Sequence, residues 1–288
     1  MTTEKKLNIK HKTVYTYDTD AWLSPQKILL SPSLRRYFHI LSYESRVTPK
    51  PQGVNYRLDM EGNLFQQVWF SQPTDKLEID IETTISTADF NPFEFIIDKA
   101  FEQRNDGGEI TFNYPSEKQP FLIPFLNNTG KPEIHEVARE FKSKSQDTVS
   151  FLVDLTAYVH QLCKHIIREA PGVWAPEKTL KEAKGSCRDL AWLLINILRS
   201  EGLASRFVSG YAYNPKLEEN HELHAWVEAF CPGAGWIGLD PSLGLLTDAF
   251  YIPLAASFLP ELTLPVIGSF TGASHSTLES YVEIKELV

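Results

Sequence analysis

Short runs of alternating hydrophobic and polar residues dominate the first third of the chain, and turns rich in Pro and Gly separate them. The runs cover residues 8–17, 68–70 and 77–86. A side-chain period of two is typical of antiparallel strands that bury one face. The pattern therefore predicts a β-sandwich-like domain over residues 1–95, followed by a loop-rich connection.

Helical spacing replaces this alternation further along the chain. Pro132 can start a helix at Glu133, and residues 190–198 form an apolar run that predicts another. Between them, one helix face is predicted from Val149, Leu152, Val153, Val159, Leu162 and Ile166. Strands are predicted at residues 205–213, 223–230 and 236–240, and the alternation returns at residues 278–287. The expected architecture is α+β, with helices packed on an antiparallel sheet in a second domain over residues 96–288 that ends in a β-rich tail.

The sequence Gly-Ser-Cys-Arg-Asp at residues 185–189 opens the last of these helices. A cysteine in the first turn of a helix faces unpaired N–H groups and the positive end of the helix dipole, which favour thiolate over thiol. Ser186 and Asp189 form a capping-box-like pair that would fix where the helix starts. Because free cysteine is often buried, packing is the alternative to a catalytic role for Cys187. Catalysis by Cys187 also requires a base nearby.

Two downstream strands offer that base and a group to orient it. His224 lies in His-Ala-Trp-Val-Glu, Asp240 precedes Pro241, and the turn residues at 231–235 predict an antiparallel hairpin between them. In an antiparallel hairpin, the residue numbers of two directly opposed partners have a constant sum. If that sum is even, the side chains of His224 and Asp240 point to the same face and are opposite or diagonal neighbours. An odd sum would separate them, and Asp240 would then merely begin a turn. The even register predicts a triad of Cys187, His224 and Asp240.

Two histidine patterns raise the alternative of a metal site. His221 and His224 are three residues apart on a predicted strand, so they point to opposite faces. His160, Cys163 and His165 are expected to share one helix face, where amphipathic packing is the alternative explanation. Neither pattern has a further ligand cluster, so we expect no metal and no cofactor.

These motifs resemble the bacterial branch of the transglutaminase-like superfamily of papain-like cysteine enzymes. The resemblance rests on Gly185-x-Cys187-x-Asp189 before an apolar helix, Arg206-x-x-Ser209-Gly210-Tyr211, His224-Ala225-Trp226-x-Glu228, and Trp236-x-x-x-Asp240-Pro241. It extends to residues 11–17 and 59–63, which are similar to the β-rich N-terminal region of this branch. Two departures are Trp192, where many relatives have histidine, and residues 258–265, which lack a Gly-Arg-Asp run.

The resemblance implies a papain-like transglutaminase core in which Cys187 attacks the carbonyl of a peptide or protein amide. His224 would carry the thiol proton to the departing amine, and Asp240 would orient the imidazole. The Cys187 backbone N–H is an expected oxyanion donor, and the Trp174 indole is a further candidate. The expected function is a cysteine protease or amidase. The alternatives are acyl transfer to an amine by a transglutaminase and a catalytically silent peptide-binding module.

Composition narrows the remaining choices. The chain has 288 residues, 42% of them hydrophobic, and a formal net charge of -9 at pH 7 that argues against a nucleic-acid partner. No apolar run approaches the ~20 residues needed to cross a bilayer, and the first residues lack the apolar centre of a secretory signal. Cys163, Cys187 and Cys231 form an odd set without Cys-x-x-Cys spacing, which is typical of reduced thiols. We therefore expect a cytoplasmic enzyme with no membrane partner, and the sequence leaves its oligomeric state open.

Overall fold

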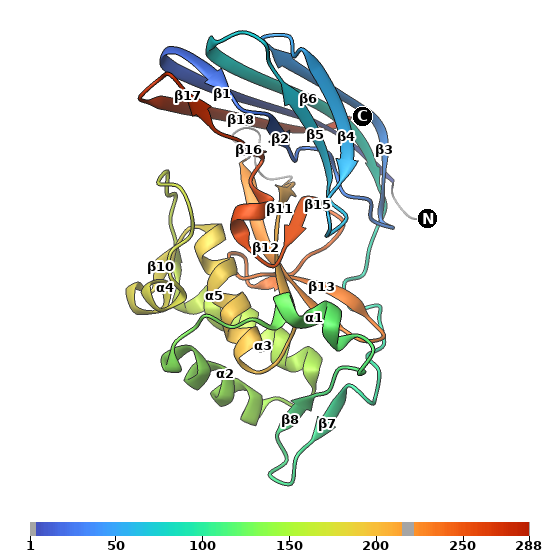
Figure 1. Ribbon diagram of the computed structural model, residues 1–288. Helices are drawn as coiled ribbons and strands as arrows, with labels where there is room; N and C mark the ends of the chain where they lie inside the picture. Colours follow the sequence, from blue (N-terminus) through green and yellow to red (C-terminus); the bar gives the residue numbers. More distant parts are fainter. Residues whose placement is uncertain (1–3, 215–221, 288) are drawn as a thin grey trace.

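A computed structural model describes residues 4–214 and 222–287 of the chain. Two β-sheets lie together at one end, the helices lie at the other end, and a third large sheet lies between them (Figure 1). The α+β class predicted from the sequence is confirmed, and so is a β-rich N-terminal region. Within the described part of the chain, no helix has the length and apolar character needed to cross a membrane.

The first sheet follows the alternation of the sequence. Its strand order is β17-β1-β6-β3, and β18 also pairs with β1. The bounds are β1 (Lys5–Leu23), β3 (Phe38–Thr48), β6 (Thr74–Thr87), β17 (Phe270–Thr271) and β18 (Ser276–Leu287). In β1 every second residue from Leu7 to Thr13 is buried, as expected for a strand with one inner face.

The second sheet of this region has the strand order β16-β2-β5-β4. Its strands are β2 (Gln26–Ile28), β4 (Gly53–Leu58), β5 (Leu64–Trp69) and β16 (Val266–Ile267). Ile28 and Val68 from this sheet share one hydrophobic core with Leu7, Leu77 and Ile79 from the first sheet. The two sheets therefore stabilise one another by burying a common apolar layer.

The end of the chain completes the first sheet. β18 pairs with β1 in antiparallel register from Lys6↔Leu287 to Tyr17↔Ser276. The tail is β-rich as expected, but its last strand hydrogen-bonds to the N-terminal sheet and not to the sheet of the second predicted domain. The boundary near residue 95 stays a prediction, and both ends of the chain contribute to the first sheet.

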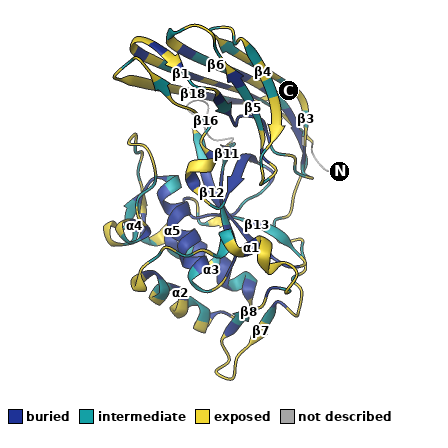
Figure 2. Cartoon of the chain, viewed as in Figure 1, coloured by how far each residue is buried: buried dark blue, intermediate teal, exposed yellow. Residues whose placement is uncertain are grey.

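The helices surround one central, buried helix. Their bounds are α1 (Gln119–Leu126), α2 (Pro132–Lys144), α3 (Thr148–Leu162), α4 (Pro176–Glu182) and α5 (Cys187–Ser200), and a 3-10 helix covers Pro260–Thr263. Residues 189–199 of α5 are all buried, and Figure 2 shows this helix in dark blue while the outer face of α2 is exposed. α2 begins at Pro132, as predicted. α3 ends at Leu162, so Ile166 lies outside the helix in which its spacing had placed it.

The sheet between these two ends carries the predicted hairpin. Its order is β14-β13-β12-β11-β15, with β11 (Ser205–Ala212), β12 (Leu223–Cys231), β13 (Gly235–Asp240), β14 (Leu245–Leu246) and β15 (Tyr251–Ser257). α5 packs against β12 and β11. Two small two-stranded sheets complete the fold, β7 (Glu102–Arg104) with β8 (Ile110–Phe112), and β9 (Lys164–His165) with β10 (Lys184–Gly185).

Residues of the two N-terminal motifs attach the first two sheets to this central sheet. The Asn63 amide donates to the Ala256 carbonyl at 2.9 Å and accepts from the Ala256 N–H at 2.8 Å. The Tyr211 hydroxyl and His11 Nδ1 are 2.8 Å apart, and both side chains are buried. The motifs that resemble the bacterial N-terminal region thus stabilise the contact with β11 and β15.

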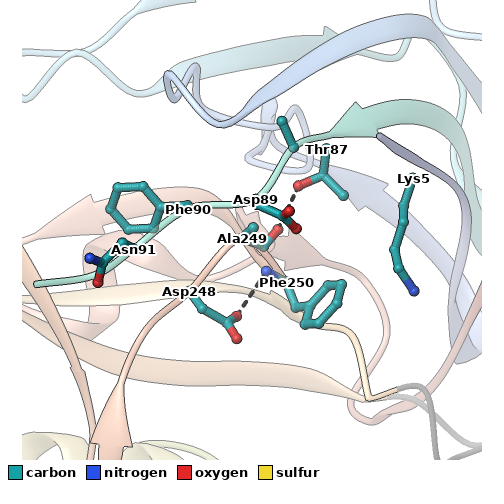
Figure 3. Close-up of a pocket in the computed structure, with 9 residues that line it drawn as sticks. Lys5, Thr87, Asp89, Phe90, Asn91, Asp248, Ala249 and Phe250 are labelled. Carbon is teal, nitrogen blue, oxygen red and sulfur yellow. Dashed lines mark hydrogen bonds between the residues drawn. The ribbon is translucent and has the colours of Figure 1, made fainter. Parts of the chain in front are cut away.

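An open pocket of about 360 Å³ lies at the same junction (Figure 3). Thr87 at the end of β6 donates to the Ala249 carbonyl at 2.9 Å, and Phe250 donates its N–H to Asp248 at 2.9 Å. Both bonds join residues that line the pocket. None of the predicted catalytic residues lines this pocket.

Candidate active site

Cys187 is the first residue of α5, as the sequence predicts. Ser186 is the N-cap, and its backbone N–H donates to the Asp189 carboxylate at 2.9 Å. A side chain at Gly185 would place its Cβ 2.8 Å from the Asp189 Cβ, so only glycine fits there. The motif therefore fixes the start of the helix and leaves the half-buried Cys187 thiol at its positive end.

Asp189 has the packing role that its position in the first turn suggests. Its fully buried carboxylate accepts two hydrogen bonds of 2.9 Å from the Arg168 guanidinium and one of 2.7 Å from the Trp174 N–H. Burial raises the pKa of Asp189, but these donors outweigh it and hold the pKa below its usual value. Asp189 thus joins the segment 168–174 to the cysteine turn.

The hairpin has the even register that the triad requires. Val227 pairs with Leu239 and Glu228 with Gly238, so opposed residue numbers sum to 466. His224 and Asp240 are then diagonal neighbours on one face, and Nε2 of the imidazole lies 2.7 Å from Oδ2 of the carboxylate. The predicted register and the predicted contact are both confirmed.

Asp240 is held by several donors besides His224. The Tyr251 hydroxyl donates to Oδ2 at 2.6 Å, and Ser242 donates to Oδ1 through its N–H at 2.8 Å and its hydroxyl at 2.6 Å. Full burial raises the pKa of Asp240, but the charge of His224 and the hydrogen bonds lower it below the usual value. The group is therefore an oriented carboxylate.

The His224 imidazole and the Ala225 N–H act on the Cys187 thiol, and both lower its pKa. Because Nε2 of His224 faces Asp240, Nδ1 is the nitrogen left for the sulfur. Burial opposes ionisation of the thiol, but its imidazole partners and the backbone donor lower the pKa of Cys187 well below its usual value. Burial also opposes a charged His224, but Asp240 and Cys187 raise its pKa. Both shifts favour a thiolate beside an imidazolium.

A second imidazole also acts on the thiol, and the sequence did not predict this. His165 lies on β9 and lowers the pKa of Cys187, whereas its spacing had placed it on a helix with His160 and Cys163. The pair Ile166-Ile167 that follows favours extended structure and is the signal that could have revealed the strand.

Only one of the two histidine patterns that raised the alternative of a metal site lies wholly within the described residues. His160 is on α3 and donates through Nδ1 to the Ser242 carbonyl at 2.9 Å, while Cys163 is buried beyond the helix end. His221 lies outside the described residues. Over residues 4–214 and 222–287, no group of three or more His, Cys, Asp or Glu side chains is arranged to hold a metal ion.

The Trp174 indole is close to two cations. The Lys178 ammonium is 3.9 Å from the indole ring centroid, and the Arg168 guanidinium carbon is 5.2 Å from it. The ring thus makes cation–π contacts on the segment that Asp189 holds. An oxyanion contact from the Trp174 indole stays a prediction.

Two further motifs support the hairpin from the neighbouring strand. Arg206 donates through Nε to Glu228 at 2.8 Å, and Arg35 donates to the other oxygen of this buried carboxylate at 3.0 Å. Gly210 pairs with His224, and a Cβ at Gly210 would lie 2.3 Å from the Ile252 carbonyl oxygen. The motif residues therefore fix the position of β12, which carries His224.

Two regions of the chain match known protein families. Residues 7–86 match the bacterial transglutaminase-like N-terminal region, and residues 135–241 match the transglutaminase-like superfamily. The chain belongs to the transglutaminase-like superfamily and carries the N-terminal region of its bacterial members.

Some relatives match nearly the whole chain and others match only a short part of it. An uncharacterized protein of Mycobacterium tuberculosis is 24% identical and covers 97% of this chain and 92% of its own length. A protein-glutamine gamma-glutamyltransferase of Pseudomonas aeruginosa is 35% identical over 65 residues, which are 20% of this chain and 10% of that protein. The crystal structure of a "putative cysteine protease" from Cytophaga hutchinsonii aligns with a TM-score of 0.72 and 18% identity, covering 100% of this chain and 93% of that chain. The last match shows that the two proteins share a fold.

Proposed function

We propose that this protein hydrolyses an amide bond in a peptide or protein, with Cys187 as nucleophile, His224 as acid and base, and Asp240 as the group that orients His224. The observation that carries the proposal is the chain of contacts from the sulfur through the imidazole to the buried carboxylate. Such a chain supplies an activated nucleophile and a base whose second nitrogen is fixed.

The reaction has two halves. The thiolate of Cys187 attacks the carbonyl carbon, the sulfur–carbon bond forms, and the carbonyl π electrons move to oxygen, where the Cys187 N–H donates a hydrogen bond. As the intermediate collapses, the carbon–nitrogen bond breaks and His224 gives its proton to the departing amine. Water then attacks the thioester while His224 takes a proton from it, and the acid leaves as the thiolate is restored beside the protonated imidazole.

Acyl transfer to an amine is the second candidate, and the local match to the Pseudomonas transferase favours it. Both reactions pass through the same thioester, and the acceptor decides the product. We favour water because the sequence pattern contains no dedicated amine-binding motif. We also propose a cytoplasmic location, supported by three cysteines that are all free.

Product analysis tests the proposal. The full-length protein is incubated with a library of glutamine-containing peptides, with and without methylamine, and mass spectrometry identifies the products. We expect mostly cleaved or deamidated peptide, a minor methylamine adduct, and no product from Cys187→Ala. Cys163→Ala is the matched control, because that buried thiol lies outside the site. Mostly methylamine adduct would support the transferase, and full turnover by Cys187→Ala would refute both mechanisms.

A further inference from the structure

Two imidazoles, His224 and His165, lower the pKa of Cys187, and the proposed mechanism uses only one of them. We propose that His165 is a further catalytic residue, which donates a hydrogen bond to the Cys187 thiolate and then to the oxyanion that forms when the thiolate attacks a carbonyl. The thiolate contact follows from the geometry of the site, whereas the oxyanion contact rests on the proposed function.

The backbone holds His165 close to the nucleophile. In the parallel pair of β9 and β10, His165 is in register with Gly185, two residues before Cys187. The Lys164 N–H donates to the Ala183 carbonyl and the Ile166 N–H donates to the Gly185 carbonyl, each at 2.9 Å. These two bonds flank His165, so the strand fixes its position relative to the start of α5.

The surroundings of the two imidazoles assign them different tasks. His224 is fixed by the buried Asp240 carboxylate, which suits a group that must take and return a proton. His165 is exposed, and no carboxylate hydrogen-bonds to it within the described part of the chain. An imidazole that is exposed and has no such partner is free to follow the negative charge as it moves.

The electrostatics agree with a donor role. The titratable groups that face His165 are Cys187, His224 and Asp240. The interaction with Cys187 raises the pKa of His165, burial and the charge of His224 lower it, and the net result is a raised pKa. A more cationic His165 is a stronger hydrogen-bond donor to an anion.

The step itself moves no proton at His165. When the sulfur–carbon bond forms, the negative charge passes from sulfur to the carbonyl oxygen, which is bonded to the same carbon. The His165 N–H loses an anionic acceptor at the sulfur and gains one at the oxygen. The leaving amine still receives its proton from His224, so His165 keeps its own proton throughout. With the Cys187 N–H, the oxyanion then has one backbone donor and one side-chain donor.

Two chemical probes separate the two contacts. Iodoacetamide alkylates a thiolate without forming an oxyanion, so its rate reports ionisation of Cys187 alone. Acylation by p-nitrophenyl acetate requires the thiolate and also forms an oxyanion. Both rates are measured from pH 5 to pH 10 for the wild-type protein, His165→Leu and His165→Gln. Lys164→Gln is the matched control, because its side chain is on the same strand and points to the opposite face. Thermal unfolding confirms that each variant is folded.

His165→Leu is expected to raise the pKa seen by iodoacetamide, with alkylation at pH 6 slower by about tenfold or more. At pH 10 alkylation should match the wild type, while acylation should stay slower by roughly tenfold to a hundredfold. His165→Gln should recover part of the acylation rate because its amide can donate, and Lys164→Gln should follow the wild type.

Other results overturn the inference. Alkylation and acylation profiles of His165→Leu that equal the wild type would remove His165 from the site. Acylation that recovers at pH 10 in parallel with alkylation would refute the oxyanion contact. Because both probes report on Cys187 directly, they give this answer even if the peptide screen finds no hydrolysis, an outcome that would count against the proposed function alone.

Discussion

Asp240 accepts a hydrogen bond from His224 across a strand pair that makes the two residues diagonal neighbours, with Oδ2 and Nε2 2.7 Å apart. Tyr251 and Ser242 donate to the same carboxylate, so its orientation is fixed from three directions. This contact keeps the proton on Nε2 and directs Nδ1 to the Cys187 sulfur.

Asp240→Asn should reduce turnover by on the order of 10²–10⁴-fold. The amide has nearly the same volume as the carboxylate, but it carries no charge to stabilise the imidazolium and its N–H can favour the wrong tautomer of His224. Initial rates on a peptide found in the product screen measure the effect. Asp154→Asn, at an exposed position of α3, is the control. Unchanged turnover in Asp240→Asn would remove the carboxylate from the mechanism.

The pH profile of kcat/KM should be a broad plateau. The acid limb should lie below the ordinary thiol pKa because the pKa of Cys187 is lowered, and the alkaline limb should lie above the ordinary imidazole pKa because that of His224 is raised. Rates measured with one peptide from pH 4 to pH 11 test this. A rate that climbs steadily to about pH 9, as an ordinary thiol ionises, would contradict the thiolate–imidazolium pair.

Asp189→Ala should lower the free energy of unfolding by about 3–5 kcal/mol. The change leaves the nearly buried Arg168 guanidinium and the Trp174 N–H without their acceptor. Chemical denaturation gives the value, and Asp154→Ala should remain within ~0.5 kcal/mol of the wild type as a surface control. A similarly small loss for Asp189→Ala would show that this carboxylate does not hold the segment 168–174.

His11 should make stability depend on pH. Burial lowers the pKa of His11 from 6.5 to about 4, so the neutral ring is favoured in the folded state. The contribution of His11 to the free energy of unfolding is fully present above its pKa in the unfolded chain. This contribution is lost as the pH falls from 6.5 towards 4, and the total loss is about 3 kcal/mol.

The variant His11→Gln isolates that contribution in denaturation curves recorded from pH 7 to pH 4. Its unfolding free energy should fall less steeply with pH than that of the wild type. The control His39→Gln, at an exposed position of β3, should keep the wild-type slope. Parallel slopes for the wild type and His11→Gln would contradict a neutral, buried His11.

Local patterns predicted the elements that carry Cys187, His224 and Asp240. Ser186 and Asp189 indicated where α5 begins, and the residues between β12 and β13 indicated a tight turn. Because side chains in strands alternate, an even sum of opposed residue numbers could be given as the condition for His224 and Asp240 to share a face. The structure meets that condition.

Contacts between distant parts of the chain could not be predicted in the same way. The apolar spacing that ends at Ile166 is compatible with either a helix or a strand. The chain forms a strand from Lys164 because this segment pairs with β10. Alternation in β18 predicts a strand but carries no information about its partner, which is β1. His165 was missed because its contact with Cys187 depends on the first of these pairings.

Selective alkylation tests the central claim, which is that Cys187 is the activated nucleophile. Burial raises the pKa of Cys163 to about 11 and that of Cys231 to about 12, whereas the pKa of Cys187 is lowered. The folded protein is treated with limiting iodoacetamide at pH 7, and peptide mapping by mass spectrometry locates the label. The account predicts label on Cys187, with Cys163 and Cys231 unmodified. Equal labelling of the three cysteines, or a Cys187 that stays unmodified while the others react, would contradict it.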